Sequence, residues 1–189
     1  MPITPQALVE TVAMILGLAE NRVKNYDRKL MEAGLRTKKG HGRGSAIMTM
    51  NDATILLLAI ASTDEINEAP TFAAYLRDFH LHEKFNDLTP LLNLIQGKAR
   101  DFNRLGSAIC AIMNYLANSD PDDDALIYLD VTLAAMVPVW ASITLIQKDR
   151  RHEIAYIKNV RTSVMGAGLQ VKRSLYGFAL QAVAKRVAA

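Results

Sequence analysis

The sequence is poor in cysteine and aromatic residues, and each scarcity excludes a class of protein. Its single cysteine, Cys110, lies in an apolar setting, so the chain can form neither an internal disulfide nor a thiolate cage around a metal. A reducing cytoplasm is the compartment that this composition favours. Only 6% of the 189 residues are aromatic but 50% are hydrophobic, which predicts a globular protein with a real core in one domain or two small ones.

Uninterrupted apolar segments and targeting signals are also lacking. The longest uncharged windows, such as residues 131–147, contain Thr, Ser, Pro and Gln and alternate like strands, so the sequence predicts no membrane span. The first ten residues, MPITPQALVE, have no basic region, and Glu10 breaks their apolar stretch. The sequence therefore predicts no signal peptide.

Positive charges only slightly outnumber negative ones, since the net charge is +3, but the two signs are unevenly distributed along the chain. Residues 20–44 hold eight Lys or Arg against three acids, residues 51–130 hold five against thirteen, and residues 131–189 hold nine against two. The two basic ends, rather than the whole surface, are therefore expected to attract a polyanion.

Helical spacing of apolar residues predicts three helices in the first third of the chain. Their expected ranges are 5–16, 20–33 and 50–63. Gly17 and Gly34 are placed to end the first two helices in the left-handed conformation. Thr49, with Asp52 three residues on, has the pattern of a capping box that opens the third helix.

The rest of the chain changes from helical to strand periodicity after the acidic turn at residues 119–124. A helix at 71–85 and a longer helical run at 90–118, weakened by Gly97 and Gly106, are expected before it. After it we expect an antiparallel meander with one buried face and a C-terminal amphipathic helix. The expected strands are 126–133, 139–145 and 153–158, and the expected final helix carries Leu169, Tyr176, Leu180, Val183 and Val187 inward and Lys172, Arg173, Lys185 and Arg186 outward.

These elements predict an α+β fold that is mostly α. An N-terminal winged helix-turn-helix domain is expected at 1–63 and a helical linker or oligomerisation region at 64–118. The meander and the final helix, at 119–189, complete the predicted organisation.

The second helix carries side chains that are suited to reading DNA. With Val23, Tyr26 and Leu30 facing inward at 100° per residue, the opposite face presents a polar set. That set is Asn21, Lys24, Asn25 and Arg28, with Arg22 beside it. Arginine presents a fork to guanine, asparagine a donor–acceptor pair to adenine, and lysine neutralises phosphate. The alternative for this helix taken alone is an ordinary solvated face.

The loop that follows, TKKGHGRGSA, favours the DNA-binding interpretation. It alternates Lys38, Lys39, His41 and Arg43 with three glycines, which allow a backbone to approach another surface closely. A solvated turn requires neither so many glycines nor so many cations, whereas a wing on phosphate explains both. The order KKGHGRGS does not match the GxxxxGK[ST] pattern of a phosphate-binding loop, and no strand is predicted before it.

Other candidate sites are weaker. His80 and His82 would point about 200° apart on a helix and could not share a metal. The acidic cluster at Asp120, Asp122, Asp123 and Asp124 lacks the glycine and closing glutamate of an EF-hand. No G-x-S-x-G or H-E-x-x-H pattern occurs, so we expect no catalytic residues, no metal ligands and no cofactor.

The order of these signals resembles that of winged helix-turn-helix regulators, most closely the DNA-binding half of MerR-type proteins and small phage or prophage regulators. The matching residues are Leu16-Gly17-Leu18, Val23 to Arg28, Gly34-Leu35, Gly42-Arg43-Gly44 and Thr49 with Asp52. The resemblance covers about 60 residues and implies that the second helix reads bases while the wing contacts phosphate. The sequence departs from the family in lacking the usual wing aromatic, a long heptad helix and a cysteine cluster.

Together these features predict a cytoplasmic, sequence-specific double-stranded DNA-binding protein, nucleoid-associated when bound, that acts as a transcriptional regulator. A homodimer is expected because one reading helix and one wing give little specificity alone. A protein partner could bind the C-terminal region. The alternatives are a small terminase-like DNA-packaging subunit that forms a ring, a module that binds an acidic protein, and last an enzyme.

Overall fold

The computed structural model describes residues 3–38, 46–82, 87–95, 99–119, 126–134, 137–147, 150–157 and 170–189. The helices are α1 (Pro5–Leu16), α2 (Glu20–Glu32), α3 (Met50–Ser62), α4 (Ala69–Arg77), α5 (Thr89–Ile95), the 3₁₀ helix η2 (Ala99–Phe102), α6 (Leu105–Asn118) and α7 (Gly177–Ala188). The strands are β1 (His80–Leu81), β2 (Leu126–Ala134), β3 (Val137–Gln147), β4 (Arg150–Ile157) and β5 (Gln170–Tyr176). The predicted α+β class is confirmed.

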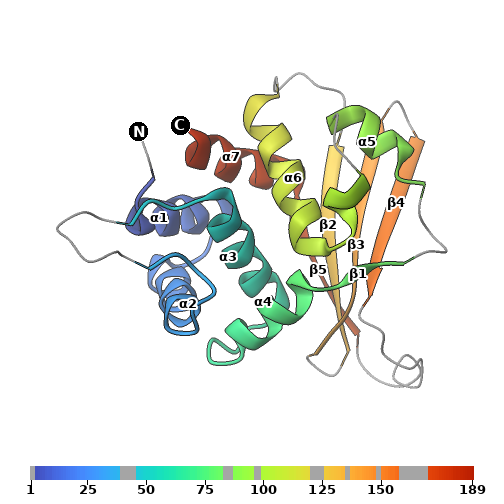
Figure 1. Cartoon of the computed structure of the whole chain (residues 1–189). Helices are drawn as coiled ribbons and strands as arrows, with labels where there is room; N and C mark the ends of the chain where they lie inside the picture. Colours follow the sequence, from blue (N-terminus) through green and yellow to red (C-terminus); the bar gives the residue numbers. More distant parts are fainter. Residues whose placement is uncertain are drawn as a thin grey trace.

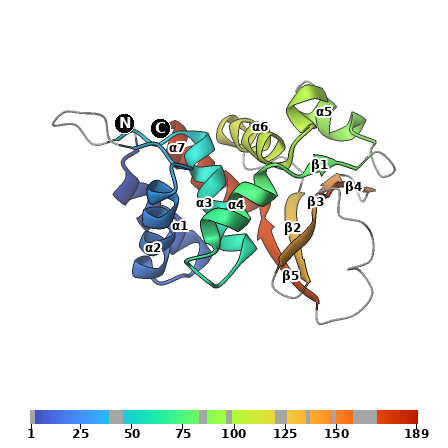
Figure 2. The ribbon, with the colours of Figure 1, turned by 60° about the horizontal axis from the view of Figure 1, so that its bottom comes forward.

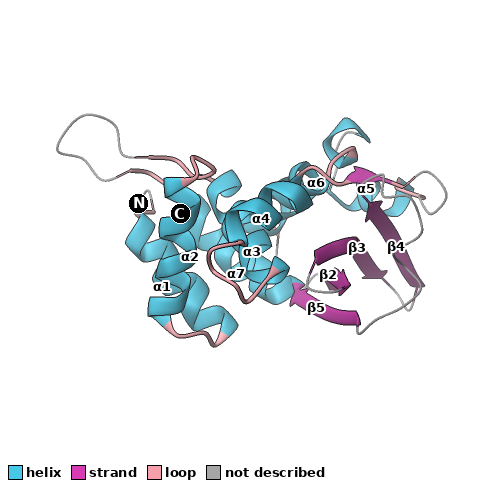
Figure 3. Cartoon of the chain, turned by 90° about the horizontal axis from the view of Figure 1, so that it is seen from below, coloured by secondary structure: helices cyan, strands magenta, loops and turns pink. Residues whose placement is uncertain are grey.

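The helices and the sheet occupy opposite ends of the molecule. Figure 1 places α1 and α2 at one end and the sheet at the other, with α3, α4 and α7 between them, and the view from below shows the same separation (Figure 3). Figure 2 shows α5 and α6 above β1, on the same side of the sheet. No helix in the described ranges has both the length and the apolar composition needed to cross a membrane.

The first three helices form where their capping residues predict them. The Thr4 side chain accepts a hydrogen bond from the Ala7 amide at 3.2 Å, and Pro5 occupies the first turn of α1. Gly17 and Gly34 have φ values of +64° and +72°, so both adopt the left-handed conformation that ends a helix. The predicted capping box at the start of α3 is also present, and all three predicted helices are confirmed.

The predicted helix at 71–85 is wrong from residue 78 to residue 82, because the chain changes direction after Arg77, and residues 83–85 lie outside the described residues. The Phe79 ring is fully buried and packs edge-on against Tyr75, with ring centroids 5.1 Å apart. Beyond it, β1 pairs with β4, and the His82 amide donates to the Ala155 carbonyl at 2.9 Å. Tertiary pairing therefore replaces the helical hydrogen bonds that the local pattern favours.

The predicted helical run at 90–118 is divided into three pieces, α5, η2 and α6. Gly97 lies outside the described residues, whereas Gly106 lies inside α6 and does not interrupt it. A Cβ at Gly106 would lie 2.5 Å from Arg77 Cγ and 3.2 Å from the Arg77 carbonyl oxygen. Gly106 therefore allows α6 to approach the end of α4 closely.

The predicted antiparallel meander is confirmed as β2, β3 and β4, but within the described ranges the sheet has five strands, in the order β1-β4-β3-β2-β5. The final helix was predicted to carry Lys172 and Arg173, whereas both lie on β5, which pairs antiparallel with β2. The helical prediction fails there because β2 offers a free edge, and pairing across Leu129↔Leu175 buries Leu175. The helix α7 starts only at Gly177.

The prediction of one buried sheet face is too simple for β3. Ala141, Ile143 and Leu145 join the hydrophobic core as expected, but Ser142 and Thr144, expected to face outward, are 2% and 3% exposed. Asp130 on β2 is also buried on that face, where it accepts a hydrogen bond from Ser174 at 2.5 Å and pairs with Lys172. The second face of the central strands is thus shielded from water at these positions as well.

One buried hydrophobic cluster connects the helical end with the sheet and includes residues from all three predicted segments of the chain. The helix α7 packs against α1, α3 and α6 through Leu180, Val183 and Ala184, which brings the two marked termini close together (Figure 1). The N-terminal helices are therefore held in place by the C-terminal helix.

The junction between β5 and α7 leaves no room for a side chain at Gly177. A Cβ there would lie 2.6 Å from the Ile127 carbonyl oxygen, which belongs to the β2 backbone and cannot move freely. We expect Gly177→Ala to lower the free energy of unfolding by about 1–3 kcal/mol, measured by urea denaturation. Phe178→Ala is the matched control, since that ring is 68% exposed, and equal effects of the two substitutions would contradict the packing argument.

Candidate nucleic-acid interface

The helix α2 is held firmly on the helical end of the molecule by its apolar stripe. Val23, Tyr26 and Leu30 are each at most 1% exposed, as the sequence pattern predicts. The Tyr26 hydroxyl donates a hydrogen bond of 2.7 Å to the carbonyl oxygen of Thr63, the C-cap of α3. This bond satisfies a buried hydroxyl and a helix-end carbonyl at once, so it fixes the position of α2 against α3.

The opposite face of α2 presents the predicted polar side chains to solvent. Asn21, Lys24 and Arg28 are exposed, and Asn25 is half-buried. The nearest acid to Arg28 is Glu32 one turn on, with 3.8 Å between Nε and Oε1 and both side chains at least half exposed. A surface pair of this kind contributes little, so Arg28 can exchange it for another anion at small cost.

Arg22 lies apart from that exposed face. Its guanidinium group pairs with Asp64 and lies 6.0 Å from the centre of the Tyr26 ring. Asp64 also accepts from Arg173 of β5 at 2.5 Å, and Arg173 donates to the Ile60 carbonyl at 3.2 Å. The structure therefore shows Arg22 in an ion-pair network that ties α2 to the end of α3 and to the sheet.

The basic loop can be described only at its two ends. Lys38 is exposed, whereas Lys39, His41 and Arg43 lie outside the described residues. After the loop, Met48 is buried, and its amide donates to the Ile3 carbonyl at 2.9 Å. The end of the loop is thus packed on the helical body beside the start of α1.

One carboxylate holds both ends of the loop. Asp52 Oδ1 accepts from the Thr37 amide at 2.7 Å, and Oδ2 accepts from the Thr37 hydroxyl at 3.0 Å. On the other side, Oδ2 accepts from the Thr49 amide at 2.8 Å and the Thr49 hydroxyl at 2.7 Å. Thr37 precedes the loop and Thr49 follows it, so Asp52 fixes the base from which residues 38–48 start and end.

The hydrogen bonds determine the charge of Asp52. Burial alone would raise the pKa of this carboxyl, but the amides and hydroxyls of Thr37 and Thr49 outweigh burial and lower the pKa below its usual value. Asp52 is therefore ionised at neutral pH, and its negative charge lies in the first turn of α3, where the helix dipole favours it.

A buried ion pair joins the start of the loop to α2. Arg36 Nη2 donates to Asp27 Oδ2 at 2.6 Å, Arg36 Nε lies 2.6 Å from Oδ1, and both side chains are less than 10% exposed. Arg36 also donates to the Thr37 carbonyl at 2.7 Å. Burial raises the pKa of Asp27, and Arg36 lowers it in opposition. The exposed helix face and the loop base are thus connected through side chains with no access to water.

The sequence pattern did not identify Asp27, Arg36 and Thr37 as parts of this interface. A usable signal was present, because Asp27 lies among Val23, Tyr26 and Leu30 on the buried side of α2, and a buried carboxylate requires a cation or hydrogen-bond donors. Which cation meets it depends on the path of the loop, which local spacing does not determine.

The other candidate sites of the sequence can be located only in part. No group of three His, Cys, Asp or Glu side chains lies close enough there to hold a metal ion. His80 lies on β1 and His82 directly after it, and the ring of His82 is 6.2 Å from that of Trp140. The acidic cluster at residues 120–124 lies outside the described residues.

Comparison of the chain with models of known protein families, with curated proteins and with solved structures gave no match.

Proposed function

We propose that this protein binds double-stranded DNA in a sequence-specific manner and acts in the cytoplasm as a transcriptional regulator. In this proposal α1, the turn at Gly17 and α2 form a helix-turn-helix, α2 enters the major groove, and the basic loop is a wing on the neighbouring phosphates or minor groove. The observation that carries the proposal is the exposed face of Asn21, Lys24 and Arg28 on a helix whose other side is firmly packed.

The chemistry of that face suits base recognition. An exposed arginine can donate two parallel hydrogen bonds to guanine, and asparagine can pair with adenine, provided that the helix does not rotate. The bond from Tyr26 to Thr63 and the buried pair of Asp27 with Arg36 restrict such rotation. Preorganised side chains lose less entropy on binding, which favours specific over non-specific contact.

Charge distribution supports the same surface. Residues 20–44 have an excess of positive charge, and the acids within this range are either buried with Arg36, as Asp27 is, or exposed at the ends of α2, as Glu20 and Glu32 are. Lys24, Arg28 and Lys38 therefore remain to meet the polyanion, Arg28 at a base and the two lysines at phosphates. Such contacts make binding strongly dependent on salt.

Substitution of Arg28 and of Lys38 should affect binding in different ways. Arg28→Ala should lower affinity for the preferred duplex by about 1–3 kcal/mol and relax specificity at one base position. Lys38→Ala should weaken binding to all duplexes alike. It should also reduce the slope of the logarithm of the affinity against the logarithm of the salt concentration by the equivalent of about one phosphate contact. The preferred duplex would come from selection in a random pool at two salt concentrations, followed by titration.

Glu32→Gln is the matched control for Arg28, because it removes the surface partner of this arginine and should leave binding unchanged or slightly tighter. Unchanged binding of the selected duplex by both Arg28→Ala and Lys38→Ala would contradict the assignment of these residues. Binding without enrichment of any duplex would contradict sequence specificity, whereas failure to bind any duplex at low salt would contradict DNA binding itself and favour an acidic protein as the partner.

We also expect the protein to bind as a homodimer, since two copies of α2 would read two half-sites on one face of the duplex. The mass in solution tests this expectation. A dimer agrees with a regulator, whereas a ring of about eight to twelve copies would replace the regulator by a DNA-packaging subunit.

A further inference from the structure

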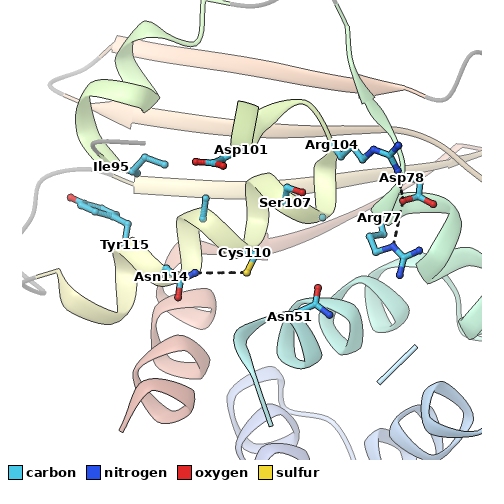
Figure 4. Close-up of a pocket in the computed structure, with 12 residues that line it drawn as sticks. Asn51, Arg77, Asp78, Ile95, Asp101, Arg104, Ser107, Cys110, Asn114 and Tyr115 are labelled. Atoms are coloured by element: carbon cyan, nitrogen blue, oxygen red, sulfur yellow. Dashed lines mark hydrogen bonds and ion pairs between the residues drawn. The ribbon is translucent and has the colours of Figure 1, made fainter. Parts of the chain in front are cut away.

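An elongated pocket of about 720 Å³ lies along α6, and none of its described lining residues belongs to α2 (Figure 4). Its walls come from α3, the end of α4, α5, η2 and one face of α6. Pockets of roughly 300–1,000 Å³ are typical of sites for small organic molecules. The lining residues therefore decide which molecule could bind there.

One end of the pocket carries more positive than negative charge. Arg77 Nε lies 3.4 Å and Arg104 Nη1 lies 3.1 Å from the same oxygen, Oδ1 of Asp78. Burial alone would raise the pKa of Asp78, but the hydrogen bonds and charges of the two arginines lower it, so this carboxyl is ionised. Two guanidinium groups thus share one carboxylate, and an arginine has five N–H donors to offer.

This arrangement can accept a second anion. Arg77 and Arg104 are 38% and 54% exposed, so their remaining donors can be reached from the pocket and from solvent. Figure 4 shows the guanidinium groups of Arg77 and Arg104 on either side of Asp78, with that of Arg77 nearer to Asn51 of α3. A carboxylate or phosphate bound here would meet charge-assisted hydrogen bonds from a planar fork, the geometry that arginine provides best.

The other end of the pocket is suited to an apolar or aromatic group. Ile95 of α5 and Tyr115 of α6 are half-buried there, and Ala111 lies one turn before Tyr115. From Arg104 to Tyr115 the axis of α6 rises about 16 Å. Figure 4 shows Ile95 and Tyr115 at the end opposite to Arg77 and Arg104, with Asp101 between the two ends.

We propose that this pocket binds a small organic anion. The carboxylate or phosphate of the ligand lies against Arg77 and Arg104, and its apolar body extends along α6 towards Ile95 and Tyr115. This site is separate from the proposed DNA-binding face and does not depend on it.

The only cysteine of the chain provides a direct reporter, because Cys110 lines the middle of the pocket and is half-buried. The experiment measures the rate at which iodoacetamide alkylates Cys110 in the full chain, at fixed pH and ionic strength. Phenyl phosphate and benzoate are the probes. Inorganic phosphate tests the charged head group alone, and benzyl alcohol tests the aromatic body without a charge. We expect saturating phenyl phosphate or benzoate to slow alkylation about tenfold, and the more effective probe identifies the preferred head group.

Substitutions then test the two ends of the pocket separately. Arg77→Gln and Arg104→Gln should each raise the phenyl phosphate concentration needed for half protection about tenfold, the loss expected for one hydrogen bond to a charged group. Ala111→Leu, which fills the apolar end, should abolish protection by phenyl phosphate but spare any protection by inorganic phosphate. Arg186→Gln, on the exposed side of α7, is the matched control and should change nothing.

Three results would overturn the proposal. The first is unchanged alkylation with every probe at concentrations up to about 10 mM, where even a weak site fills. The second is equal protection of the wild type and the two arginine variants, with their melting temperatures unchanged. The third is protection by benzyl alcohol as strong as that by phenyl phosphate, since the charged head would then play no part.

Discussion

Replacing Arg36 by alanine is expected to destabilise the protein by about 3–5 kcal/mol. The substitution leaves the Asp27 carboxyl buried on α2 without its cation, since both side chains are less than 10% exposed. It also removes the bond from Arg36 to the Thr37 carbonyl at the start of the basic loop. Urea denaturation at neutral pH would measure the effect.

The pH dependence of this loss has a definite sign. Burial raises the pKa of Asp27, and without Arg36 it rises further. A carboxyl whose pKa is raised by folding favours the folded state while protonated, and that contribution is lost as the pH rises through the folded-state pKa. The destabilisation by Arg36→Ala should therefore shrink towards acid pH, where the isolated Asp27 takes up a proton.

A double substitution separates the ion pair from simple packing. Asp27→Leu with Arg36→Met replaces both charged groups by apolar ones and should recover most of the stability lost by Arg36→Ala. A loss below about 1 kcal/mol for the single variant, or a loss that does not vary with pH, would show that Asp27 is not an uncompensated buried charge.

Asp52→Ala should cost about 2–4 kcal/mol of stability, because it removes a helix cap and leaves several donors without their shared acceptor. The amides and hydroxyls of Thr37 and Thr49 all point to this carboxylate, which is 1% exposed. Unlike the loss of Arg36, this change leaves no buried charge behind. It should release both ends of the basic loop and weaken DNA binding as well.

The same carboxylate should contribute to acid unfolding. Its pKa is lowered in the folded state, so its contribution is complete above the unfolded-state pKa and is lost as the pH falls through the folded-state value. Asp52→Asn should flatten this acid limb in stability measured against pH. Thr49→Ala is the intermediate case, since it removes the cap hydroxyl at a cost of about 1 kcal/mol and one of the donors to the carboxylate, and it should make the acid limb shallower without abolishing it. An acid limb of unchanged depth in Asp52→Asn would contradict the role of Asp52.

The elements that the sequence predicted correctly are those whose signals are local. Thr4, Gly17 and Gly34 specify helix ends through caps and left-handed backbone, and these act within a few residues. The alternation along β2 and β3 is equally local. The exposed side of α2 followed from the same kind of local periodicity, because burial of Val23 and Leu30 on one face of a helix leaves the opposite face to solvent.

The elements that were missed depend on partners distant in the sequence. β1 and β5 are edge strands whose pairing is supplied by β4 and β2, and strand preference is more dependent on context than helix preference. The same is true of the ion pair of Asp27 with Arg36 and the bonds from Thr37 to Asp52, which require the loop to return to α3. The capping pattern predicted that Asp52 opens a helix. Its second role, which is to bind the start of the basic loop, depends on where Thr37 lies.

The hold of Asp52 on Thr37 and Thr49 has a consequence for chain entropy. The entropic cost of closing a loop grows with the logarithm of its length and is about 2 kcal/mol for a loop as long as residues 38–48. Because Asp52 joins the two ends of this loop in the folded protein, the cost is part of folding and is not added to the free energy of ligand binding. Because this cost grows only logarithmically, doubling the length of the loop would add only about 0.6 kcal/mol. Insertions before the buried Met48 can therefore accumulate with little effect on the fold, so what the loop contacts can diversify while its base stays the same.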